Sequence, residues 1–205
     1  MNDYRGLLIK KQRKELDISL EALSHGVCSP SYLSKIENNI LVANDDIYNL
    51  LFKKLGICTM DTIKEERIKQ MLDLFFKYYM SSDSKIFKII NELLEYKDEV
   101  VSSRLFVQYQ LFLLFASELN SQINISLAEV EAYYSYMDDS QREYFNLFRL
   151  SSGNIELSDN EEWIFIRKLK AKANLYAYQK NVFAAYDLYK TCLNYAVELG
   201  NKMLI

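Results

Sequence analysis

Five polar side chains between residues 29 and 38 have the chemistry needed to recognise a nucleic acid: Ser29, Ser31, Tyr32, Lys35 and Asn38. Hydroxyl, phenol and amide groups form hydrogen bonds with base edges and with sugar–phosphate oxygens, and a lysine ammonium group binds phosphate through its charge. These groups can act together only if one structural element presents them on one exposed face.

The sequence predicts such an element, a short helix that begins at Ser29-Pro30. Serine is a preferred N-cap, and proline fits the first helical position because its missing N–H would have no partner there. Leu33 and Ile36 are three residues apart and form the inward-facing pair. The polar side chains therefore lie on or beside the exposed face.

Two further helices precede this one. The first covers residues 4–17, and the second starts after the N-cap Ser19 and ends at Gly26; a fourth helix covers residues 45–56. A helix braced by an earlier helix, with its N-terminal side chains facing the major groove, is the helix-turn-helix arrangement. We therefore expect a DNA-binding helix-turn-helix domain over residues 1–57.

The segment IKKQRKELDISLEALSHGVCSPSYLSKIENN resembles DNA-binding domains of the phage-repressor/Cro type. Its short part GVCSPSYLSKIE is more similar to the peptide-pheromone-sensing regulators of the RRNPP family, which include the Rgg and PlcR groups. The resemblance implies that Arg13 and Glu37 form a structural ion pair and do not contact DNA. It also implies a glutamine that touches the DNA backbone just after the cap of the second helix, but this chain has Leu20 there.

The rest of the chain, residues 58–205, reads as a helical regulatory and dimerisation region. Only five Gly and one Pro in 205 residues favour long helices with short connections, so the fold class is all-α. The amphipathic pattern predicts helices near residues 60–81, 84–97, 99–120, 126–137, 139–151, 159–179 and 182–199.

The last two of these helices resemble a tetratricopeptide (TPR) repeat that starts at Ile166, which makes the region a TPR-like array of helical hairpins. The repeat's small and aromatic packing positions hold Ala173, Tyr176, Ala185, Tyr189 and Cys192. An array of this type exposes an apolar face at its end unless something covers it. We expect either that the region is incomplete at its C-terminus or that a partner covers this end.

Arg167, Lys170 and Asn174 recur at intervals of three and four residues on the predicted concave face of this repeat. Two cations and an amide could hold the carboxylate and the backbone of a short peptide. The alternative is an ordinary solvated helix face.

Composition and charge limit the other possibilities. The head (residues 1–57) has eight basic and seven acidic side chains, so its charge is +1, and the remaining residues account for −4 of the net −3. The longest apolar run, residues 111–116, is too short to span a membrane, and three scattered cysteines favour reduced thiols in the cytoplasm. The single His25 and the absence of nucleotide-binding or metal-binding motifs give no reason to expect an enzyme, a cofactor or a metal site.

These observations favour a transcriptional regulator that binds double-stranded DNA as a homodimer, because one weakly basic head makes few contacts. In this hypothesis a short signalling peptide controls the regulator, as in quorum sensing. Two alternatives stay open at this stage. One is a phage- or plasmid-type repressor whose helical body only dimerises, and the other is a TPR-like protein-interaction adaptor.

Overall fold

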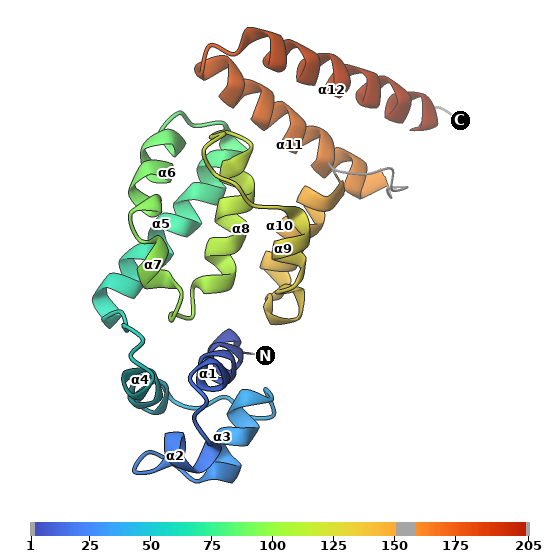
Figure 1. The fold of residues 1–205 in the computed structure, drawn as a ribbon. Coiled ribbons are helices and arrows are strands. Elements are labelled where there is room, and N and C mark those ends of the chain that lie inside the picture. Colours follow the sequence, from blue (N-terminus) through green and yellow to red (C-terminus); the bar gives the residue numbers. More distant parts are fainter. Residues whose placement is uncertain (1–2, 151–158, 204–205) are drawn as a thin grey trace.

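The computed structural model describes residues 3–150 and 159–203, and within these ranges every regular element is a helix. The predicted all-α class is therefore confirmed. A small N-terminal bundle lies at one end of the molecule, and a larger helical body follows it (Figure 1). None of the described helices is long and apolar enough to cross a membrane.

The N-terminal bundle contains four helices: α1 (Tyr4–Glu15), α2 (Leu20–Ser24), α3 (Pro30–Glu37) and α4 (Asp45–Lys54). Its core is made of aliphatic side chains together with two aromatic ones, Tyr48 and Phe52. Helices α1 and α3 cross closely at Gly6, where a Cβ atom would lie 2.3 Å from the carbonyl oxygen of Ile36. Only glycine allows that approach, so Gly6 sets the position of α3 against α1.

The body begins with the long helix α5 (Thr62–Ser81), which is capped by Asp61. The helices that follow it are α6 (Ile86–Leu94), α7 (Lys97–Val100), α8 (Phe106–Ser117), α9 (Leu127–Glu131), the short 3-10 helix η1 (Tyr134–Tyr136), α10 (Asp139–Leu150), α11 (Asp159–Tyr178) and α12 (Val182–Met203). Aromatic rings fill the space between α5 and α8; Phe75 and Phe112, for example, pack edge to face at 4.9 Å.

Two of the helices predicted for the body are wrong in their extent. The predicted helix 99–120 is interrupted before α8. There the Ser103 hydroxyl donates a hydrogen bond to the Val100 carbonyl and accepts one from the Leu105 backbone N–H. Serine side chains that bond nearby backbone groups compete with the helical pattern in this way. The predicted helix 126–137 is α9 followed by η1, so only its first part is α-helical.

Helices α11 and α12 form an antiparallel hairpin, and they turn at Lys180, whose φ is 61°. The small side chains of Ala173, Ala185 and Cys192 are buried, which lets the two helices approach closely. Tyr189, by contrast, is 40% exposed, although it was predicted to pack inside a repeat. Among the described residues α12 packs chiefly against α11, and part of the Tyr189 ring stays at the surface.

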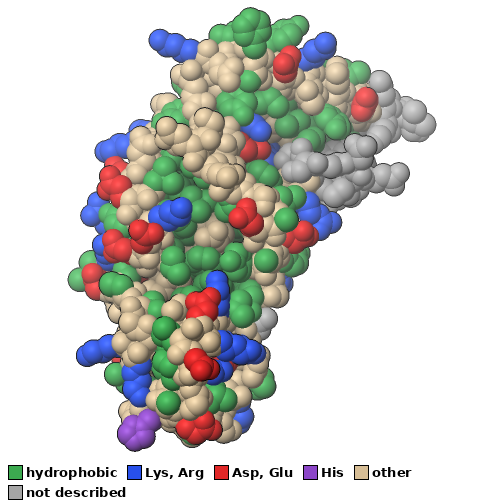
Figure 2. All heavy atoms as spheres, viewed as in Figure 1, with side chains coloured by type: hydrophobic (Ala, Val, Ile, Leu, Met, Phe, Trp, Pro, Cys, Tyr) green, Lys and Arg blue, Asp and Glu red, His purple; other side chains and the backbone are tan. Residues whose placement is uncertain are grey.

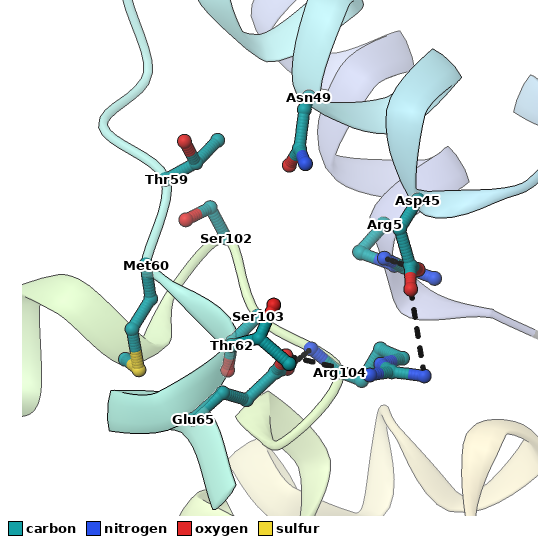
Figure 3. Close-up of a pocket in the computed structure, with 10 residues that line it drawn as sticks. All are labelled: Arg5, Asp45, Asn49, Thr59, Met60, Thr62, Glu65, Ser102, Ser103 and Arg104. Atoms are coloured by element: carbon teal, nitrogen blue, oxygen red, sulfur yellow. Dashed lines mark hydrogen bonds and ion pairs between the residues drawn. The ribbon is translucent and has the colours of Figure 1, made fainter.

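The head and the body meet through aromatic contacts, a charged contact and a hydrogen bond in which the Asn39 amide donates to the Tyr136 hydroxyl at 3.2 Å. The Tyr4 ring stacks on Phe106 of α8, with 4.1 Å between the ring centroids. Asp45 at the start of α4 accepts from Arg5 at 2.9 Å and lies 3.7 Å from Arg104 of the body, so one carboxylate links the two parts (Figure 3). The Arg5 hydrogen bond keeps the pKa of Asp45 below its usual range.

Candidate nucleic-acid interface

Helix α3 begins as the sequence predicts. The Ser29 hydroxyl accepts a hydrogen bond from the Tyr32 backbone N–H at 3.1 Å, and Pro30 occupies the first turn. Gly26 precedes it with a φ of 72°, a left-handed conformation that suits glycine and produces the tight turn after α2. The Ser29 side chain is thus the helix cap, and its hydroxyl already has an intramolecular partner.

Two apolar anchors fix which face of α3 is turned to solvent. Leu33 and Ile36 are fully buried in the core of the bundle, whereas Ser31 and Lys35 are exposed. These two exposed residues are four apart and so lie on one side of the helix. Tyr32 is half-buried and packs against the core, which leaves only part of its ring at the surface.

Arg13 and Glu37 are brought together in a bidentate ion pair. The Arg13 Nε and Nη2 atoms donate to the Glu37 carboxylate at 2.6 and 2.8 Å, and the Arg13 Nη1 donates to the Ile18 carbonyl at 2.9 Å. The hydrogen bond to Glu37 raises the pKa of Arg13. The pair joins α1, the α1–α2 turn and α3, so it positions α3 without facing the solvent.

Asn38 lies at the C-terminal end of α3, and its amide has partners on both sides. Its Nδ2 donates to the Ser34 carbonyl at 2.8 Å, and its Oδ1 accepts from the Lys10 ammonium group of α1 at 2.7 Å. Lys10 was not among the predicted contact residues. It lies beside the end of α3 and adds a cation there, and the basic pattern of the first helix was the only sequence signal for it.

Helices α2 and α3 lie far from the hairpin α11–α12 (Figure 1). In Figure 1, α2 and α3 are at the lower end, with α1 and α4 between them and the body.

The three residues predicted to bind a peptide differ in their surroundings. Arg167 and Lys170 are exposed on α11, but the Asn174 amide donates to the Ser82 hydroxyl at 3.1 Å and accepts from the Tyr189 hydroxyl. Asn174 thus ties α11 to the end of α5 and to α12. The structure leaves two cations, and not the full trio, open on that face.

A buried charge cluster beneath α11 was not predicted. Lys172 and Lys168 lie 2.8 and 3.8 Å from the Glu118 carboxylate, and Lys168 is fully buried with its ammonium group 4.2 Å from the centre of the Phe148 ring. Burial lowers the pKa of Lys168 to about 8. The sequence RKLKAK (residues 167–172) has a lysine at every second position. This pattern does not indicate which lysines are buried, because it does not predict which face of α11 packs against the body.

Residues 3–150 and 159–203 contain no group of three or more His, Cys, Asp or Glu side chains that is placed to hold a metal ion. The three cysteines are free thiols.

Comparison with known proteins agrees with this geometry. Residues 9–63 match the helix-turn-helix family, so this part of the chain is a helix-turn-helix domain. The chain is also similar to the transcriptional activator NprA of Geobacillus stearothermophilus, with 25% identity over 130 residues. The match includes 62% of this chain and 32% of that relative, so the matched segment spans about a third of the relative's length. No solved structure matches the chain.

Proposed function

We propose that the protein is a transcriptional regulator in the cytoplasm that reads double-stranded DNA with α3 as a homodimer and catalyses no reaction. The observation that carries the proposal is the division of α3 into two faces. Leu33 and Ile36 hold the helix in the bundle, and Ser31 and Lys35 stand exposed four residues apart. The helix-turn-helix match over residues 9–63 supports it, as does the similarity to a protein named a transcriptional activator.

The reading helix supplies two kinds of contact in this proposal. Ser31 hydrogen-bonds a base edge or a phosphate from the N-terminal turn of α3, and Lys35 binds phosphate or guanine one turn later. Lys10 and Asn38 extend the polar surface at the other end of the helix. Since Leu20 is half-buried against the core, the backbone contact that related domains make there is absent from this set.

Salt dependence tests DNA binding. Sequences selected from random duplexes with the full chain supply the probe, and the dissociation constant is measured over a range of salt concentrations. Each phosphate contact that is lost lowers the logarithmic slope by about one unit. Lys35→Ala is expected to weaken binding and flatten the slope, while Lys53→Ala, at an exposed lysine of α4, is the matched control. Failure to select any duplex would overturn the proposal.

Control by a short peptide is the finer part of the proposal. Arg167 and Lys170 are two exposed cations about one helical turn apart, and together they can bind a peptide carboxylate. Calorimetry of the full chain with short apolar peptides tests it, with Arg167→Ala/Lys170→Ala as the variant and Lys77→Ala, at an exposed lysine of α5, as the control. If no peptide binds the wild-type chain, the body only holds the regulator together and senses nothing, as in a phage-type repressor.

A further inference from the structure

Helix α12 carries an apolar stripe that nothing in the described structure covers. Five of its residues recur at intervals of four, three, four and four, which places them on one face of the helix. We call this set, with the neighbouring Phe183, the α12 stripe: Val182, Phe183, Tyr186, Tyr189, Leu193 and Val197. Phe183 is 87% exposed and both Tyr186 and Leu193 are 64% exposed, which is unusual for side chains of this size.

The stripe is distinct from the face that holds α12 in the molecule. Ala185, Cys192 and Leu199 are buried against α11, and they lie about a quarter of a turn or more around the helix from the centre of the stripe. Helix α12 therefore has two apolar faces. One packs against α11, and the other is the exposed α12 stripe. Apolar side chains also reach the surface at this end of the molecule in Figure 2.

The exposed area is of the size that a stable pair of proteins buries. A fully covered aromatic side chain buries roughly 150–250 Å², and the exposed fractions along the stripe then correspond to about 700 Å². A standard interface buries about 800 Å² on each partner. The polar residues that flank the stripe bring the total near that value.

The pattern of the stripe is complementary to itself. If two copies of α12 lie antiparallel about a two-fold axis near Tyr189, Val182 of one copy faces Val197 of the other, and Tyr186 faces Leu193. Asp187 and Lys190 both lie along the same edge of the stripe, and antiparallel helices bring like edges together. Each Asp187 would then meet the Lys190 of the other copy, so the pair forms twice.

We propose that the α12 stripe binds a second copy of this chain, with the two α12 helices antiparallel. This inference deepens the homodimer of the proposed function by naming its contact surface. The stripe lies at the end of the molecule opposite α2 and α3 (Figure 1), so a dimer formed there leaves both reading helices uncovered. Its test contains no DNA, and its failure is therefore distinguishable from a failure of DNA reading.

Sedimentation equilibrium of the full chain at micromolar concentrations measures the association directly. Wild type is expected to sediment at twice the 24.2 kDa mass of one chain. Tyr186→Glu/Leu193→Glu is expected to weaken the dimer at least about a hundredfold, because the two charges lose hydration in the contact. Ile63→Glu is the matched control, because Ile63 is an exposed apolar residue of α5 outside the stripe.

A charge exchange tests the antiparallel pairing and requires no change in the core. Asp187→Lys places like charges together twice and is expected to weaken the dimer about tenfold. Asp187→Lys/Lys190→Asp exchanges both charges in each copy and is expected to restore wild-type association. The helical circular dichroism of each variant shows that it is folded.

Three outcomes would overturn the proposal. One is a wild-type chain that is monomeric throughout, which would leave the stripe to a different partner. Another is a dimer that tolerates Tyr186→Glu/Leu193→Glu as well as it tolerates Ile63→Glu. The third is a charge exchange that fails to restore association, since the antiparallel pairing brings Asp187 of one copy to Lys190 of the other.

Discussion

Replacing Arg13 by methionine removes the cation from a carboxylate that is almost fully buried. The Glu37 side chain is 3% exposed, and it accepts two charge-assisted hydrogen bonds of 2.6 and 2.8 Å from Arg13. Breaking a buried pair from one side leaves an uncompensated charge and costs about 3–5 kcal/mol. Arg13→Met also leaves the Ile18 carbonyl without its donor, so we expect a loss of about 4 kcal/mol in the stability of the N-terminal bundle.

Removing both charges is expected to cost much less. In Arg13→Met/Glu37→Leu no ion is left without a partner, and apolar side chains of similar size fill the space. The double variant should lose only about 1 kcal/mol relative to wild type. The difference between the single and double variants measures the coupling of the two residues.

Hydrogen exchange of the backbone amides in α1 and α3 is the assay, because it reports the bundle separately from the body. A loss of about 4 kcal/mol accelerates exchange roughly a thousandfold. The amides of α8 serve as the internal control and should not change. If Arg13→Met accelerates exchange less than about fivefold, or if the double variant is as unstable as the single one, the ion pair does not hold α3 in place.

Three further predictions concern the bundle, the buried cluster and the junction. Gly6→Ala should destabilise the bundle by about 1–3 kcal/mol in the same exchange assay, because the added Cβ would lie 2.3 Å from the Ile36 carbonyl oxygen. Gly200→Ala should instead stabilise its helix by about 0.5–1 kcal/mol, because the added Cβ meets nothing within 4 Å. Lys168 has a pKa of about 8 in the folded chain and an ordinary pKa of 10.5 when unfolded. Between these pH values the unfolded chain binds the proton more tightly, so the free energy of unfolding rises as pH increases. Urea unfolding over that pH range should show this rise in wild type and not in Lys168→Met. Tyr4→Ala removes the stack on Phe106 and should speed thermolysin cleavage between the head and α5 several-fold.

Each of these has a result that would contradict it. Equal effects of the two glycine substitutions would mean that the close crossing of α1 and α3 does not matter. An unchanged pH profile in the lysine variant would show that its ammonium group is not the source of the rise. Cleavage at the wild-type rate in the tyrosine variant would mean that the stack does not hold the head against the body.

The sequence predicted the bundle well because its signals are local. A serine followed by a proline defines the start of α3, and the spacing of Leu33 and Ile36 defines its inner face. The placement of Arg13 opposite Glu37 came from a family resemblance, since 24 residues separate them along the chain. Local pattern alone does not pair residues that far apart.

Local pattern did not reveal the contacts that form between helices distant in the sequence. Asn174 was assigned to a ligand, but the end of α5, some ninety residues earlier in the chain, supplies its hydroxyl partner. The helix spacing of α11 gave no sign that Lys168 would be buried beside Glu118. The contact that joins Asp45 to Arg104 across the junction could not be predicted either, because it depends on how the head packs against the body.

The most direct test of the central claim is the ratio between specific and non-specific DNA binding. The dissociation constants of the full chain for a selected duplex and for a scrambled duplex of the same length are compared at one salt concentration. We expect wild type to prefer the selected duplex by about a thousandfold or more, and Ser31→Ala/Lys35→Ala to reduce that preference by at least about tenfold while exchange protection of α1 and α3 is unchanged. A wild-type chain that binds both duplexes equally, or a variant that keeps the full preference, would contradict the assignment of α3 as the reading helix.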